Sequence, residues 1–211
     1  MIEPLLRLVE IFELETKNVG YPNEVQTSPR EYGYCPAIIV LAVVVFESAL
    51  NLIRHSSKEK EEDKPNRAID YFRSLSAEPS INAKVAELFV IRDAIVHNHV
   101  WDGSIIDDQD GLHYIEGPRL TSGYGDKKHK KHVNEESHQT KELGLNVVPT
   151  KIWRRDVVEV FSVIDEALIF LESIDRGYFG ADKQIFIFHG EYVSFHTAVA
   201  RIKKTGLIPV R

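Results

Sequence analysis

Apolar side chains recur every three or four residues in five stretches of this chain. Positions with that spacing share one face of an α-helix, so the pattern predicts five amphipathic helices. Turn-forming or charged segments separate them, such as NVGYPNEVQTSPREYGYCP before the second helix and HSSKEKEEDKPN after it. The predicted helices cover residues 2–17, 36–55, 65–76, 80–101 and 151–175.

The second of these helices, PAIIVLAVVVFESALNLI, is apolar on almost every side. Glu47 interrupts its apolar run after about ten residues, whereas a helix that crosses a bilayer needs roughly 18 to 20. We therefore interpret it as the core helix of a bundle and expect no membrane partner. Burial is predicted to be deepest along residues 38–52.

The helical pattern stops at Asp102 and returns at Thr150, the predicted N-cap of the last long helix. Glycines interrupt residues 103–150, and the stretch GDKKHKKHVNEESHQTKE is polar and low in complexity. A long surface loop is therefore predicted for this insertion.

The tail differs in kind from the rest. KQIFIFHGEYVSFH predicts two short strands around residues 189–191, and TAVARIKKTG predicts a terminal helix that stops at Gly206. The predicted fold class is therefore mainly α. It comprises an antiparallel helical bundle over residues 1–175 with the 103–150 loop insertion, followed by a 176–211 extension with a β-hairpin and a helix.

Composition excludes several classes of protein. With 211 residues and 43% hydrophobic side chains, the chain can form one sizeable core, which excludes disorder throughout. Cys35 is the single cysteine, which excludes an intrachain disulfide scaffold and suits the reducing cytoplasm. The N-terminus lacks the basic flank of a signal peptide. A net charge of -6 argues against a generally basic surface for nucleic acid but permits a local basic patch.

The segment VAELFVIRDAIVHNHVWD places a charged residue, Arg92, in an apolar helical stripe, where an unpaired charge costs several kcal/mol. Asp93 and His97 are four residues apart, so the carboxylate is placed to accept the imidazole N–H. Arg92 and His97 are five residues apart, or about 140° around the helix. They converge only through the reach of the arginine, a loosened helix end or a second copy of the helix in a dimer.

Arg92, four intervening residues and His97, with Asp93 directly after the arginine, resemble the signature of the HEPN superfamily. Glu47 in VVVFESALNLI adds a polar group of the kind that this superfamily directs toward its site. The resemblance covers residues 1–101 and the last long helix. It implies a homodimeric, cytoplasmic endoribonuclease that needs no metal or other cofactor.

The residues carry over as follows. His97 would act as acid or base, Arg92 would grip the scissile phosphate, and Asp93 would orient the imidazole. These residue types suit metal-free cleavage, which needs proton transfer and positive charge on the phosphate. Several members of the superfamily are toxins or antiphage defence effectors, so a cognate antitoxin protein is an expected partner besides RNA. Three further side chains would support the site: Glu47, Asn98 and His99.

The insertion carries the basic run KKHKK, which we expect at the mouth of the same cleft because both ends of the insertion attach to helices flanking it. These lysines would then contact the RNA backbone, although a charge run is also typical of a solvated loop. The histidines nearby lack the rigid setting of a metal site, and no metal is expected. The lysines are Lys127, Lys128, Lys130 and Lys131, and the histidines are His129, His132 and His138.

Structural interpretations stay open for the same helix. Arg92 serves packing in one of them, paired with Glu47 or Asp93. His97 and His99 serve as helix C-terminal residues whose charge complements the macrodipole. The corresponding function is a non-catalytic module that binds nucleotide, RNA or a partner protein.

Overall fold

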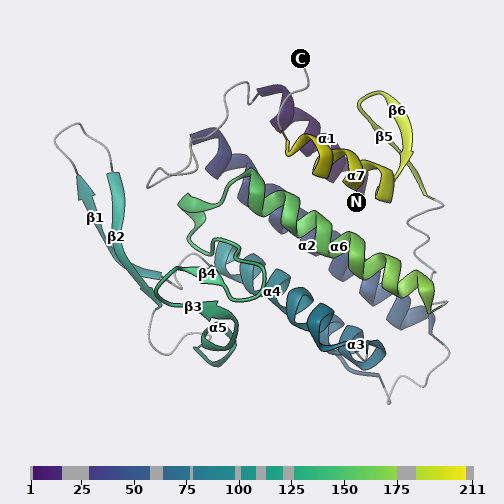
Figure 1. The fold of residues 1–211 in the computed structure, drawn as a ribbon, viewed down its shortest axis with the longest axis horizontal. Helices are drawn as coiled ribbons and strands as arrows, with labels where there is room; N and C mark the ends of the chain where they lie inside the picture. The colour runs from purple at the N-terminus through teal and green to yellow at the C-terminus, as the bar shows by residue number, and fades with distance from the viewer. Residues whose placement is uncertain are drawn as a thin grey trace.

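Helix α2 (Pro29–Ser56) is the central element of a helical bundle (Figure 1). α4 packs on both α2 and α6 and runs antiparallel to them (Figure 1). The helices in contact with α2 are α1 (Ile2–Glu15), α3 (Ala68–Leu75), α4 (Pro79–Val96) and α6 (Arg154–Ser173). The computed structural model describes residues 2–15, 29–57, 64–76, 78–97, 101–107, 113–120, 126–174 and 184–207. The predicted helical bundle is confirmed.

The core position of α2 follows from its apolar residues. Ile38, Val43 and Leu50 are completely buried in the main hydrophobic cluster, as predicted. Leu52 is 49% exposed, against the prediction, because it lies off the face that the helical repeat directs into the core. By length and composition alone Gly33–Ser56 is able to cross a membrane, but more than half of its most apolar window is buried inside the bundle, as in a core helix.

The end of α4 differs from the prediction. Apolar spacing extends the helix to residue 101, but it ends at Val96, and His97 is its C-cap with φ -101° and ψ 65°. Val96 is 55% exposed, so the last turn has left the core. The predicted stripe through Arg92 is therefore wrong in its last turn, because the apolar pattern continues beyond the residues that pack.

Three other helices begin at residues other than those predicted. α6 has Trp153 as its N-cap instead of Thr150, because residues 149–151 form a separate 3-10 turn, η3 (Pro149–Lys151). The Asp156 carboxylate accepts the backbone N–H of Trp153 at 3.0 Å and so fixes this start. α2 begins earlier than predicted and α3 begins later.

Residues 103–150 do not form the single long loop that their composition predicts. An antiparallel hairpin, β1 (Trp101–Asp107) and β2 (His113–Leu120), projects from the bundle (Figure 1). After it come α5 (Asp126–His132) and a second hairpin of β3 (Val133–Asn134) and β4 (Gln139–Thr140).

Helix α4 supplies the anchors for the second part of this insertion. Glu87 is completely buried, and its carboxylate accepts the backbone N–H of Glu142 at 3.0 Å and of Leu143 at 2.9 Å. A small apolar cluster joins the same surfaces and consists of Val90, Ala94, Val133 and Val147. A polar sequence is ordered here because a distant helix provides its partners.

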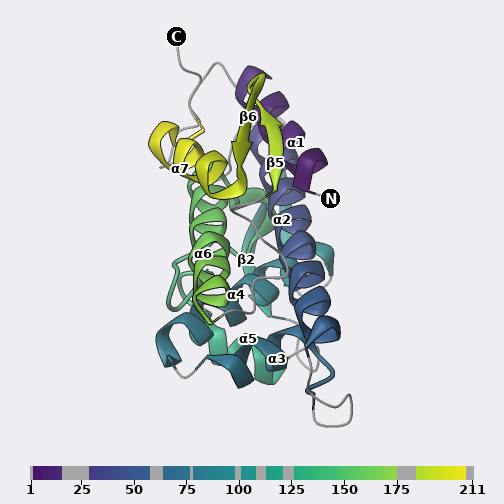
Figure 2. The same cartoon turned by 90° about the vertical axis from the view of Figure 1, so that its right-hand side faces the viewer.

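The tail confirms its predicted elements. β5 (Ile185–Phe188) and β6 (Glu191–Ser194) form an antiparallel hairpin, and α7 (Phe195–Thr205) follows directly. Gly206 is its C-cap, with a φ of 60° that glycine adopts without steric cost. The hairpin lies against α1 and α7 lies against α6, at the end of the bundle away from α3 and α5 (Figure 2).

Candidate basic cleft

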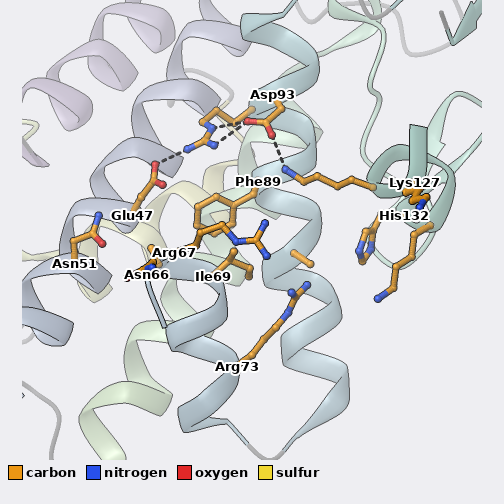
Figure 3. A pocket seen from close by; sticks show the side chains of 15 residues that line it. Glu47, Asn51, Asn66, Arg67, Ile69, Arg73, Phe89, Asp93, Lys127 and His132 are labelled. Carbon is orange, nitrogen blue, oxygen red and sulfur yellow. Dashed lines mark hydrogen bonds and ion pairs between the residues drawn. The ribbon is translucent and has the colours of Figure 1, made fainter. Parts of the chain in front are cut away.

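A cleft of about 670 Å³ lies between α2, α3, α4 and α5 (Figure 3). Among the described residues, its lining carries six cationic side chains against two carboxylates, Glu47 and Asp93. The cations come from the start and end of α3, from α4 and from α5: Arg67, Arg73, Arg92, Lys127, Lys128 and Lys131. We call this space the basic cleft.

Arg92 of α4 lines the basic cleft and forms ion pairs with Glu47 of α2 and with Asp93 of its own helix. Its Nη1 donates to the Glu47 carboxylate, while Nε and Nη2 donate to Asp93 Oδ1 at 3.0 and 2.8 Å. The guanidinium also lies over the Phe89 ring, 5.2 Å from its centroid. The side chain is 21% exposed, so the charge is paired and partly hydrated. Both partners named in the structural interpretation of Arg92 are in place.

Asp93 joins two elements of the basic cleft. Its Oδ2 accepts from Lys128 Nζ on α5 at 2.5 Å, and its Oδ1 faces Arg92. Burial raises the pKa of this carboxyl, but the hydrogen bonds and charges of Lys128 and Arg92 outweigh burial and leave the pKa below its ordinary value. Asp93 is therefore a carboxylate near neutral pH that ties α5 to α4. Its predicted role in orienting His97 stays a prediction.

His97 caps α4 at the place where the helix ends. Its backbone N–H still bonds to the Asp93 carbonyl at 2.9 Å, but its φ and ψ are no longer helical and it is exposed. Among the described residues lining the basic cleft, the histidine is His132 and not His97. The helix therefore ends directly before His97, which is one of the conditions under which His97 and Arg92 can converge. Asn98 and His99 lie outside the described residues.

Three of the four lysines of the basic run line the same cleft as Arg92. Lys127, Lys128 and Lys131 line the basic cleft from α5, because residues three and four apart share a helix face. Lys130 is exposed and lies off that face, and its carbonyl accepts from Lys141 Nζ at 2.8 Å.

The sequence interpretation missed the contribution of α3. Arg67 and Arg73 line the basic cleft and both bind Asp70, at 2.6 Å and 3.2 Å respectively. Their spacing of three around Asp70 is the signal that places them on one helix face. Nothing in the sequence indicates that this face lies opposite α5.

His132 is the other residue missed. The polar sequence around it predicts a residue of a solvated loop, yet His132 is 9% exposed and lines the basic cleft from the end of α5. Burial lowers the pKa of its imidazole, and the charges of nearby cations lower it further. Those cations are Lys131, Arg73, Lys128 and Lys141. The imidazole is therefore neutral near neutral pH.

Taken together, the lining suits a polyanion. Guanidinium forks and ammonium groups from three helices match phosphate oxygens. In the part of the chain that the structure describes, no three His, Cys, Asp or Glu side chains are grouped closely enough to hold a metal ion. No protein-family model, curated protein or solved structure matches the chain.

Proposed function

We propose that the chain is a metal-independent endoribonuclease of the HEPN type, acting in the cytoplasm as a homodimer. One observation carries the proposal: the Arg92 fork lines a cleft in which five further cations from α3 and α5 gather around two carboxylates. Such an excess of positive charge in a concave site attracts and holds a phosphate backbone. The HEPN resemblance of Arg92 and His97 supplies the reaction.

In this proposal RNA is cleaved by its own 2′-hydroxyl. That oxygen attacks the neighbouring phosphorus, and the bond to the 5′-oxygen breaks, leaving a 2′,3′-cyclic phosphate. Negative charge builds up on the phosphate oxygens during the attack, and Arg92 stabilises it. Glu47 and Asp93 hold the guanidinium before RNA binds, so its orientation is set in advance.

The homodimer is proposed because Arg92 lines the basic cleft of its own chain, whereas His97 is not among the described residues that line it. His97 and the exposed Val96 lie together at the end of this helix. A two-fold axis beside that end brings the His97 of one copy to the basic cleft of the other. A role as a toxin or defence effector, with a cognate antitoxin protein as partner, follows from the resemblance alone and belongs to the same proposal.

A second candidate function is a non-catalytic module that binds RNA, nucleotide or a partner protein. The observation favouring it is that Glu47, Arg92, Asp93 and Lys128 already form a continuous ion-pair network. Such a network has a structural use without any reaction, since it joins α2, α4 and α5.

Activity and stability together separate the two functions. Under the ribonuclease proposal the wild type cleaves single-stranded RNA in EDTA, leaves a cyclic phosphate and spares DNA, which lacks the attacking hydroxyl. Arg92→Ala and His97→Ala each lower cleavage by about 10²-fold, the scale of losing a charge stabiliser or a proton-transfer group. Arg92→Ala costs only about 1 kcal/mol of stability, because the ion pairs are partly exposed.

The binding-module function predicts another pattern. RNA then binds the wild type and stays intact. If Arg92 is chiefly structural, Arg92→Ala leaves both Glu47 and Asp93 without their cation and destabilises the fold by clearly more than the ~1 kcal/mol of an isolated exposed pair. Thermal unfolding and RNA cleavage, each measured on the wild type and on Arg92→Ala, decide between the two patterns. Light scattering of the wild type tests the dimer.

A further inference from the structure

His132 is held in the basic cleft by the way α5 ends. Its backbone carbonyl accepts the N–H of Lys141 at 2.9 Å, which ties the last turn of α5 to the segment after β4. Figure 3 shows its imidazole turned from α5 toward the cleft, on the side where Arg73 of α3 lies. The ring therefore belongs to the same cavity as Arg92 within one chain.

The surroundings of the ring are cationic. Lys128 and Lys131 face it from its own helix, Arg73 from α3 and Lys141 from the segment after β4. Among the described residues its side chain makes no hydrogen bond and no ion pair. A neutral imidazole has one nitrogen that accepts a proton, and here that nitrogen has no protein donor among those residues.

These features suit a base more closely than a phosphate anchor. An anchor for phosphate is best charged, and the cations around His132 disfavour its charged form. A proton acceptor is best neutral at the working pH and within reach of a bound hydroxyl. The neighbouring cations would hold the phosphate next to it.

We infer that His132 is the base that removes the 2′-hydroxyl proton of RNA bound in the basic cleft, an inference that rests on the proposed ribonuclease function. The proton passes from O2′ to the free imidazole nitrogen as O2′ forms its bond to phosphorus. The bond from phosphorus to the 5′-oxygen breaks, and that oxygen takes its proton from His97, the acid of the proposed function. The His132 imidazolium then returns its proton to solvent and His97 regains one from solvent, so the site is restored. His97 is thereby assigned the acid role and no part in the proton abstraction.

The test compares His132→Ala with His138→Asn. His138 lies in the same insertion outside the cleft lining and has φ 54°, a conformation that asparagine tolerates. The substrate is a short single-stranded RNA labelled at both ends, cleaved under single-turnover conditions. We expect His132→Ala to lose about 10²-fold in cleavage with unchanged RNA affinity, and His138→Asn to match the wild type. Free imidazole should restore part of the lost rate.

The pH profile of the wild type gives a readout that needs no variant. The cleavage rate should rise with pH, and the midpoint of this rise should lie below the ordinary histidine pKa of 6.5. The folded His132→Ala protein should lack the rise. A midpoint above 6.5, full activity in His132→Ala, or an equal loss of binding and cleavage overturns the inference while leaving the ribonuclease function in place. A wild type that cleaves no RNA overturns both.

Discussion

Single carboxylates in this protein hold more than one partner, and the docking of separate elements depends on them. Asp93 binds Arg92 on its own helix and Lys128 on α5. Glu10 on α1 accepts from Arg7 and from the backbone N–H of His189 in the β5–β6 turn. In each case one anion joins segments far apart in sequence, so the loss of one side chain affects two elements.

His196 on α7 provides a prediction of pH-dependent stability. Its Nδ1 lies 2.5 Å from Asp165 and its Nε2 lies 3.2 Å from Glu172, both on α6. Burial lowers the pKa of the imidazole, but hydrogen bonds and charges of the two carboxylates outweigh burial and place the pKa above 6.5. The folded state thus favours the imidazolium. Its stabilising effect is complete below pH 6.5 and is lost as the pH rises through the raised pKa.

Urea unfolding at several pH values checks this. The free energy of unfolding of the wild type should fall as the pH rises above about 6.5 and through the raised pKa, and His196→Gln should remove that part of the slope. His55→Gln, at an exposed position, serves as the control and should keep the wild-type slope. If the pH dependence of the free energy of unfolding is unchanged in His196→Gln, the charged form of His196 does not stabilise the folded state.

At the scale of elements, the link between α4 and the insertion is the most consequential. Glu87 is the only described side chain that accepts both backbone N–H groups of residues 142 and 143. Glu87→Ala leaves those two part-buried donors without their acceptor. We expect a loss of about 2 kcal/mol, since each donor that is only partly buried costs about 1 kcal/mol when it loses its partner.

The matched control is Glu142→Ala, which removes an exposed side chain and keeps the backbone N–H that Glu87 accepts. Hydrogen exchange should become faster at residues 142–145 in Glu87→Ala and stay unchanged in Glu142→Ala. RNA affinity should fall with Glu87→Ala, because α5 is then held less firmly. Equal exchange in the two variants would refute the anchoring role.

At the scale of the whole molecule, charge is distributed unevenly. The chain has a net charge of -6, yet the basic cleft concentrates cations from three helices. The overall charge repels RNA at a distance, and salt screens this repulsion beyond about 10 Å. Binding is therefore expected to depend on local contacts between the cleft and phosphates.

Salt dependence of RNA binding measures those contacts. Changing Lys127, Lys128 and Lys131 together to glutamine should weaken binding and reduce the slope of log K against log salt by about 2, since each phosphate contact with a single strand contributes about 0.7. Lys130→Gln removes the same type of charge from the same helix outside the cleft lining, and should leave the slope nearly unchanged. If the triple variant keeps the wild-type slope, α5 is only a solvated helix. Fluorescence anisotropy at several salt concentrations gives both values.

Much of the architecture was determined by the sequence through local rules. The repeat of three to four residues identified the bundle helices and the buried face of α2. The His189–Gly190 turn between two apolar runs identified the tail hairpin, and Gly206 identified the end of α7. The position of Arg92 in an apolar helix indicated that it has an acidic partner, and Glu47 and Asp93 were named correctly. The helices, the hairpin and the helix end follow from residues that are close in sequence. The acidic partners of Arg92 follow from the cost of burying an unpaired charge.

Only the tertiary structure decided where the insertion lies and what lines the basic cleft. Residues 126–142 are largely polar and lack an apolar helical period, and their order comes from contacts with α4 such as that of Glu87, 55 residues away from Glu142. The positions of Arg73 opposite α5 and of His132 inside the cavity arise from the same docking. The physical reason is that hydrophobic periodicity reports which face of a segment is buried, but not which distant segment covers it.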